Sequence, residues 1–161
     1  MGVGTGLTIG FLALLLIVAT TIWLVERGNS LLEQSARQRS TRIAAEQLRD
    51  HLRTEESSER GFLLTGNQIY LAPYDTAKAD ARRELEELTR LIAPTAPNRA
   101  MLPRLAEAVN EKIAEMDACI ALKSAGRDAE ALSLTQRNRG KALMDEINVF
   151  LYNAILIADE D

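Results

Sequence analysis

Hydrophobic residues follow two different patterns along this chain. Residues 7–25 carry no charge and are dominated by Leu, Ile, Val and Ala, so apolar side chains would face every direction of a helix. Beyond residue 25, apolar positions recur at steps of three and four, the spacing of a helix that buries one face. Alternating β-branched or aromatic residues, which signal strands, are absent from the sequence. The pattern predicts an all-α chain in which one uniformly apolar helix precedes several amphipathic ones.

The apolar segment over residues 7–25 has the length of a membrane-spanning helix. At about 1.5 Å per residue it reaches roughly 28 Å, close to the hydrocarbon thickness of a bilayer. Trp23, near its end, suits the membrane–water interface. A signal peptide would have a shorter apolar core and a clear cleavage site. We therefore predict an uncleaved single transmembrane helix bound to the lipid bilayer, with Gly28 and Asn29 loosening the junction behind it, so that the anchor and junction comprise residues 1–29.

Turn signals divide the rest of the chain into four predicted helices. Gly66 and Asn67 readily take the left-handed conformation that ends a helix, and Gly126 does so before a cap at Asp128. Two prolines within residues 94–97 form the remaining stop. We expect helices over residues 30–64, 68–92, from Asn98 or Leu102 to residue 123, and 128–158. Because the connections are short, residues 30–161 should form an antiparallel up-down-up-down four-helix bundle.

Each predicted helix has an apolar stripe that should face the bundle core. The first and second helices contribute Leu31, Ile43, Leu48 and Leu52, then Tyr74, Ala77, Ala81, Leu85, Leu88 and Ile92. The third and fourth contribute Leu105, Val109, Lys112 or Ile113, Met116, Cys119 or Ile120, then Leu132, Leu143, Ile147, Leu151, Ala154 and Ile155.

Composition and residue counts exclude several classes of function. The 19 basic and 23 acidic residues are interspersed and sum to a net charge of -4, which argues against nucleic acid as a partner. A single cysteine, Cys119, excludes an internal disulfide, and a single histidine, His51, excludes a multi-histidine metal site. Glu55, Glu56 and Glu59 could pair as acid and base or bind a cation, but the Glu-x-x-His spacing of a di-metal bundle is missing. We expect no catalysis, no cofactor and no metal.

The most distinctive stretch is the corner over residues 56–74, where one helix ends and the next begins. Asn67 can cap the new helix, and Pro73 falls near its start, where a missing N–H costs little. Tyr70 and Tyr74, one predicted helical turn apart, can fold back over Phe62. The sequence therefore predicts a sharp helix–turn–helix corner, which an ion pair between residues 56 and 60 would secure.

This corner closely resembles the signature of CHASE3 domains, in which Leu63, Leu64 and Leu71 also match and Phe62 stands where Tyr is common. A second match is the Gly-Lys-x-x-Met-Asp-x-Ile run at residues 140–147. The resemblance covers about residues 30–158. It implies an extracytoplasmic four-helix bundle of the kind that serves as the input module of bacterial membrane receptors. The candidate residues, either structural or part of a ligand-responsive site, are Glu56, Arg60, Gly61, Phe62, Thr65, Gly66, Tyr70, Pro73 and Tyr74.

Charge and resemblance disagree about the side of the membrane on which the bundle lies. Arg27, Arg37, Arg39 and Arg42 follow the apolar segment and no Lys or Arg precedes it, so the positive-inside rule places the bundle in the cytoplasm. The resemblance implies a single-pass protein of the inner membrane with its bundle in the periplasm or outside the cell. We follow the resemblance, because longer domains translocate largely regardless of charge.

Two functions are compatible with these features. In the first, which we favour from sequence, the chain is a non-enzymatic accessory subunit that docks on a membrane complex or forms a homodimer, because the sequence ends three acidic residues after the fourth helix without a second span. Trp23, Phe150, Tyr152 and Ile155 would then contact the partner protein. In the second, the chain is the input domain of a truncated histidine kinase or chemoreceptor. A ligand or partner would then shift the first helix against the fourth.

Overall fold

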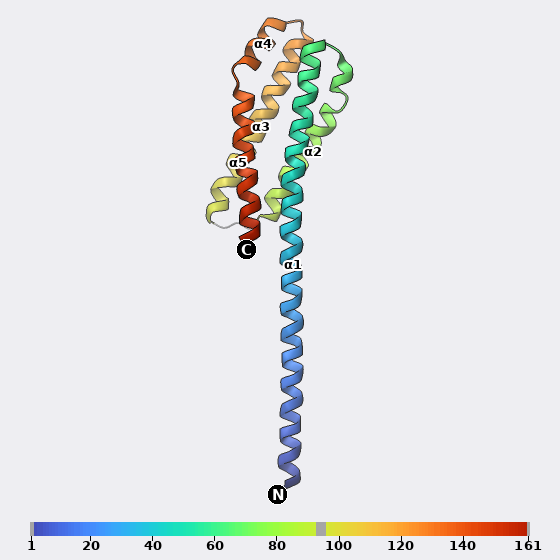
Figure 1. Ribbon diagram of the computed structural model, residues 1–161, viewed down its shortest axis with the longest axis vertical. Coiled ribbons are helices and arrows are strands. Elements are labelled where there is room, and N and C mark those ends of the chain that lie inside the picture. The colour runs from blue at the N-terminus through green and yellow to red at the C-terminus, as the bar shows by residue number, and fades with distance from the viewer. Residues whose placement is uncertain (1, 93–95, 161) are drawn as a thin grey trace. The chain divides into compact units, whose positions relative to one another are not determined.

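All regular structure in the described residues, 2–92 and 96–160 of this computed structural model, is helical. Figure 1 shows the helices in chain order. They are α1 (Gly2–Thr65), the 3₁₀ helix η1 (Gln68–Leu71), α2 (Tyr74–Leu91), α3 (Ala96–Ser124), α4 (Asp128–Gln136) and α5 (Arg139–Glu160). The predicted all-α fold class is confirmed for these residues.

Residue contacts divide the chain into two units, residues 1–37 and residues 38–161. In the first unit, the side chains described between residues 12 and 25 are all exposed. Among the described residues, no helix combines the length and the apolar character needed to cross a membrane. The side chains of residues 7–11 and of residue 13, which belong to the predicted span, lie outside the described part.

The expected loosening of the chain at Gly28 and Asn29 is wrong, because α1 continues through both residues. A glycine inside a helix costs about 1 kcal/mol relative to alanine, and asparagine costs less. Good helix formers such as Leu24 and Glu33 lie on either side. A local cost of this size does not end a helix that has favourable residues before and after it.

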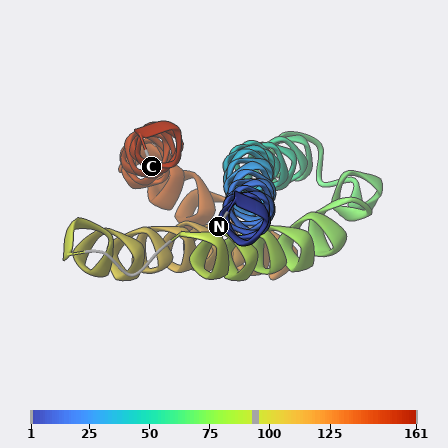
Figure 2. The same ribbon diagram turned by 90° about the horizontal axis from the view of Figure 1, so that it is seen from below.

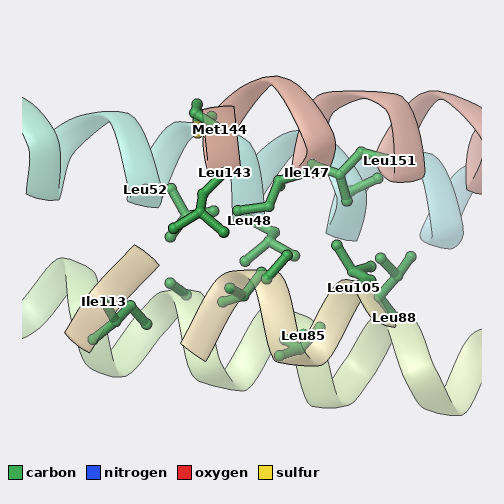
Figure 3. Close-up of a cluster of buried hydrophobic side chains, with 14 of the residues drawn as sticks. Leu48, Leu52, Leu85, Leu88, Leu105, Ile113, Leu143, Met144, Ile147 and Leu151 are labelled. Carbon is green, nitrogen blue, oxygen red and sulfur yellow. The ribbon is translucent and has the colours of Figure 1, made fainter. Parts of the chain in front are cut away.

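The second unit is a helical bundle in which successive long helices reverse direction (Figure 1). Viewed from its lower end, α2 and the start of α3 lie on one side and α5 lies on the other (Figure 2). The core contains leucine and isoleucine side chains from α1, α2, α3 and α5 that point toward one another (Figure 3). Fully buried examples are Leu48 and Leu52 of α1, Leu88 of α2, Leu105 of α3 and Ile147 of α5. The predicted stripes of the second and third helices are confirmed throughout.

Two predicted core positions, Ile43 and Leu132, are wrong, because both side chains are exposed. The buried face of α1 passes through Ala44 and Ala45 instead, whose small side chains let neighbouring helices come close. In α4 the buried residue is Ala131, one position before Leu132. The side chain of Leu31 lies outside the described residues.

The predicted second and fourth helices are each interrupted. Residues 68–71 form η1, and α2 begins only at Tyr74, because Pro73 takes the N-cap position and has no N–H to continue a helix. The fourth helix is divided into α4 and α5 at Asn138, which has a φ of 56°. Asparagine is one of the few residues that tolerate this left-handed conformation. Gly126 is left-handed as predicted, but the N-cap of α4 is Arg127 rather than Asp128.

Candidate functional site

The corner between α1 and η1 is closed by backbone and hydroxyl hydrogen bonds. Gly66 has a φ of 69°, which glycine adopts without strain, and its N–H donates to the carbonyl oxygen of Phe62 at 2.7 Å. The hydroxyl of Thr65 donates to the Gly61 carbonyl at 2.7 Å and accepts from the N–H of Asn67 at 3.1 Å. These bonds satisfy groups that a helix end would otherwise leave without partners. The corner is therefore fixed by its own short sequence.

The ring of Tyr70 lies directly against Gly61. A Cβ atom at residue 61 would come within 2.4 Å of Cδ1 of the tyrosine, which is closer than packed carbon atoms approach. Phe62, the next residue in sequence, is buried, whereas Tyr70 is 44% exposed. Since Tyr70 belongs to η1 and Tyr74 begins α2, the prediction that the two tyrosines lie one turn apart on the same helix is wrong. The glycine is required here by the close approach of the ring.

Tyr74 links α2 to α3 through a polar cluster next to the core. Its hydroxyl donates to Oδ1 of Asp117 at 2.9 Å, and Nζ of Lys78 donates to the same oxygen at 2.9 Å. Burial, and then the nearby Asp117, raise the pKa of Tyr74, so it stays protonated and acts as a donor. Tyr74 is thus a buried structural contact between two helices.

Glu55 of α1 is the most deeply buried charged residue near this cluster. It has no exposed surface, and neither carboxylate oxygen has a hydrogen-bond partner within the described part of the chain. Burial raises the pKa of Glu55 to about 7, and the opposing attraction of Lys78 is smaller. The side chain therefore changes charge near neutral pH.

Glu56 faces α3. Its Oε1 accepts from Nζ of Lys112 at 3.1 Å and pairs with the guanidinium of Arg60 at 3.0 Å. The Lys112 side chain is only 3% exposed, whereas that of Arg60 is 66% exposed. The predicted ion pair of residues 56 and 60 is confirmed, and a buried lysine joins it to α3.

These charged groups border a cavity of about 310 Å³ between α1, α3 and the break that separates α4 from α5. Its lining consists of Glu56, Glu59, Arg60, Lys112, Glu115, Met116, Cys119, Thr135, Asn138, Gly140 and Lys141. Burial raises the pKa of Glu59, and a hydrogen bond from the Cys119 thiol opposes that shift. Burial also raises the pKa of Cys119 to about 11, so its sulfur remains a thiol. The chemistry available here is binding of charged or polar groups.

Gly140 lets two charged side chains enter this cavity from α3. A Cβ atom at residue 140 would lie 2.6 Å from Oε2 of Glu115 and 2.9 Å from Nζ of Lys112. Any larger residue would displace both charged groups. That Glu115 oxygen is buried and has no hydrogen-bond partner among the described residues.

Of the nine predicted corner residues, only Glu56 and Arg60 line the cavity. Sequence reasoning missed Lys112 and Glu115 as site residues because neither belongs to a stretch that carries the resemblance. A signal was present, since Lys112 occupies a stripe position where an apolar side chain is usual. Gly140 was noted only as part of the run at residues 140–147.

Of the four predicted partner-contact residues, two are half-buried and two are exposed. Phe150 and Ile155 are half-buried and pack on the bundle core, and the guanidinium of Arg104 lies 5.7 Å from the Phe150 ring centre. Tyr152 is exposed, and so is Trp23, whose ring centre lies 5.5 Å from the Arg27 guanidinium in the first unit.

Comparison with known proteins gives two matches. The sequence profile described as the CHASE3 domain matches residues 32–155. The crystal structure of the Rhodopseudomonas palustris histidine kinase HK9 sensor domain has a TM-score of 0.65 and 25% sequence identity, covering 74% of this chain and 93% of that chain. None of the curated proteins matches this chain. Because the profile match spans well over half of the sequence, the chain belongs to the CHASE3 domain family.

Proposed function

We propose that this chain is the sensory input domain of a membrane receptor, in which a ligand bound by the bundle shifts α1 against α5. The observation that carries the proposal is the match of residues 32–155 to a family of sensor domains. The similarity to a histidine kinase sensor domain, over nearly all of that chain, supports the same role. The chain acts in this proposal by binding and displacement and carries out no reaction.

The accessory-subunit hypothesis has less support than the sensory one. It required an exposed apolar surface at the end of the last helix, but the side chains of Phe150 and Ile155 pack against the core of their own bundle. The comparisons point to sensing and give no support to docking. Sensing is therefore the better explanation of the fold.

The same proposal places the bundle outside the cytoplasm, anchored in the inner membrane by residues 7–25. CHASE3 domains are extracytoplasmic sensor domains of membrane receptors, which supports this orientation over the one that charge alone predicts. The uncharged sequence of the segment and the exposure of its described side chains suit contact with lipid.

The charged cavity is the region best situated to convert binding into displacement. It is bordered by α1, by α3 and by the first residues of α5, so a bound molecule contacts the helices that must move. Lys112 connects α3 to α1 through Glu56 and also lies against Gly140 of α5. A ligand that changes the position of Lys112 therefore acts on both helices at once.

A chimeric receptor tests the sensory role directly. Residues 1–161 are joined to the second membrane span and cytoplasmic part of a histidine kinase whose own sensor domain has been removed, and autophosphorylation is measured in membrane vesicles. We expect Lys112→Met and Gly140→Ala to change the basal rate roughly fivefold or more, in line with typical coupling energies. Arg83→Ala, on the exposed side of α2, serves as the control. Equal rates for all four proteins, with recovery of the chain in a larger complex from mild detergent, would favour docking.

A further inference from the structure

The cationic side chains that line the cavity already have anionic partners. Among the described lining residues these are Lys112 and Arg60, which share Oε1 of Glu56, and Lys141, whose Nζ lies 2.5 Å from Oδ2 of Asp145. The Arg60 and Lys141 side chains are both more than 60% exposed, so their charged ends are largely solvated. The charges of Arg60 and Lys141 are therefore largely neutralised by these carboxylates and by solvent.

Two carboxylates on the cavity wall lack such a partner in the described part of the chain. Glu59 is 7% exposed, and its favourable interactions are the weak thiol donor of Cys119 and the attraction of Lys112, whose ammonium is already bonded to Glu56. Glu115 places a buried Oε2 toward Gly140 with no hydrogen-bond donor among the described residues. A buried carboxylate without a cation or donors is costly. With these two acids, the charged residues of the lining and the Asp145 partner of Lys141 comprise four carboxylates (Glu56, Glu59, Glu115 and Asp145) and three cations (Arg60, Lys112 and Lys141).

The surroundings of these acids favour an organic cation over a metal ion. Among the residues whose side chains are described, no group of three or more His, Cys, Asp or Glu is arranged so that it could hold a metal ion. The ammonium of Lys112 also lies within 3 Å of the same point beside Gly140 as the Glu115 oxygen, and at equal distance it repels a divalent ion about twice as strongly as a singly charged alkylammonium. An alkylammonium spreads its contacts over several directed hydrogen bonds and fits a cavity at the small end of ligand sites.

We propose that this cavity binds a small molecule with a primary ammonium group, which donates hydrogen bonds to Glu59 and Glu115. The proposal builds on the sensory role and names the ligand class for the same cavity. Lys112 has N–H groups beyond the one that Glu56 accepts, so a ligand that also carries a carboxylate would find a donor there. Simple amines and amino acids therefore share the chemistry that the two acids recognise.

Calorimetric titration of the full chain in detergent at pH 8 tests the proposal with four probes: 1,4-diaminobutane, L-alanine, uncharged butane-1,4-diol and Mg²⁺. We expect 1,4-diaminobutane, L-alanine or both to bind, and the diol not to bind. If L-alanine alone binds and Lys112→Met abolishes its binding, the ligand is an amino acid. If 1,4-diaminobutane alone binds, the ligand is an amine without a carboxylate.

Variants of the two acids decide whether binding occurs in this cavity. Glu59→Gln and Glu115→Gln preserve shape but remove the charge, and each should weaken binding of the amine about tenfold. Glu107→Gln, an exposed position on α3, is the matched control and should leave affinity unchanged. Circular dichroism of each variant establishes that it is folded. No binding of either amine, binding that both acid variants leave intact, or binding of Mg²⁺ alone overturns the proposal.

The calorimetric experiment and the chimera experiment can succeed or fail independently of each other. The chimera measures changes in kinase activity without any added ligand, so it can succeed while the amine titration fails. In that case the sensory role stands and the proposed ligand class is wrong. If the amine binds but Lys112→Met does not change the kinase activity of the chimera, the cavity is a binding site that does not control signalling.

Discussion

At the scale of single residues, the corner depends on how closely Tyr70 approaches Gly61. A Cβ at position 61 would overlap the tyrosine ring, although the helical backbone there accepts any residue. Replacing Gly61 by alanine therefore has two effects of opposite sign on the free energy of unfolding. Alanine has a helix propensity about 1 kcal/mol better than glycine, but it cannot be accommodated under the ring without moving it.

Gly61→Ala should lower the free energy of unfolding by about 1–3 kcal/mol, because overlap with the ring outweighs the gain in helix propensity. In a Tyr70→Ala background, the same change should raise stability by roughly 0.5–1 kcal/mol, since the ring is gone and only propensity remains. Urea unfolding of the four proteins completes the cycle. If Gly61→Ala has the same sign in both backgrounds, the ring contact is not the reason for the glycine.

Glu55 should make stability depend on pH. Its pKa is raised to about 7 in the folded chain from a usual value near 4.5, so the folded state binds more protons than the unfolded state between those values. Stability therefore falls as the pH rises from about 4.5 to about 7 and remains lower above that range. At about 1.4 kcal/mol per pKa unit, the loss is at most roughly 3 kcal/mol.

Glu55→Gln removes the charge and should stabilise the chain at pH 8 by about 1–3 kcal/mol, with a much smaller effect at pH 4.5. Urea unfolding at both pH values measures the difference. Asp50→Asn, an exposed carboxylate on α1, provides the control. An equal effect of Glu55→Gln at the two pH values would show that residue 55 does not titrate in this range.

At the scale of helices, periodicity predicted the buried faces of α2 and α3 but not the breaks in the chain. The turns at Gly66 and Gly126 are predictable from sequence, because glycine readily takes the left-handed conformation. The break at Asn138 has no glycine or proline at its centre, and its local signals, the asparagine itself and Gly140 two residues later, are weaker than a glycine in the turn. Periodicity also placed Ile43 on the buried face of α1, whereas the buried residues there are its neighbours Ala44 and Ala45.

Asn138→Ala should lower stability by about 1–2 kcal/mol, because alanine has a Cβ that opposes a φ of 56° and lacks a side chain that can bond locally. The asparagine amide donates to the Gln136 carbonyl at 3.2 Å, and that bond is also lost. Asn138→Gly should change stability by much less, since glycine takes the left-handed conformation freely. Thermal unfolding distinguishes them, and equal losses for the two variants would contradict the conformational explanation.

At the scale of the whole domain, the family and bundle were predictable from one local motif, whereas the cavity was not. The corner residues are adjacent in sequence and identify the fold directly. Glu59, Lys112, Glu115 and Gly140 come together only when α1, α3 and α5 pack. No periodicity shows that a lysine on a buried stripe will meet a glycine almost thirty positions later. Long-range juxtapositions of this kind require the folded structure.

The proposed displacement of α1 against α5 has a consequence that can be measured on the chain itself. Gln47 of α1 and Asn153 of α5 are exposed, so spin labels on cysteines at these positions report the separation of the two helices. Cys119→Ser removes the native thiol while keeping a hydroxyl opposite Thr135. Saturating amine, using whichever of 1,4-diaminobutane and L-alanine binds, should change the mean distance by about 1–2 Å, the size of helix shifts in known switches.

A second label pair on α1 alone, at Gln47 and Thr54, should show no change with ligand, because both positions belong to one rigid helix. Repeating the measurement with Lys112→Met asks whether the buried lysine transmits the movement. With 1,4-diaminobutane, which has no carboxylate for Lys112 to bind, we expect the variant to lose most of the distance change even at ligand concentrations that saturate it. A ligand-bound chain whose α1–α5 distance equals that of the free chain would mean that the cavity binds without displacing the helices, and signalling would then have to use another part of the bundle.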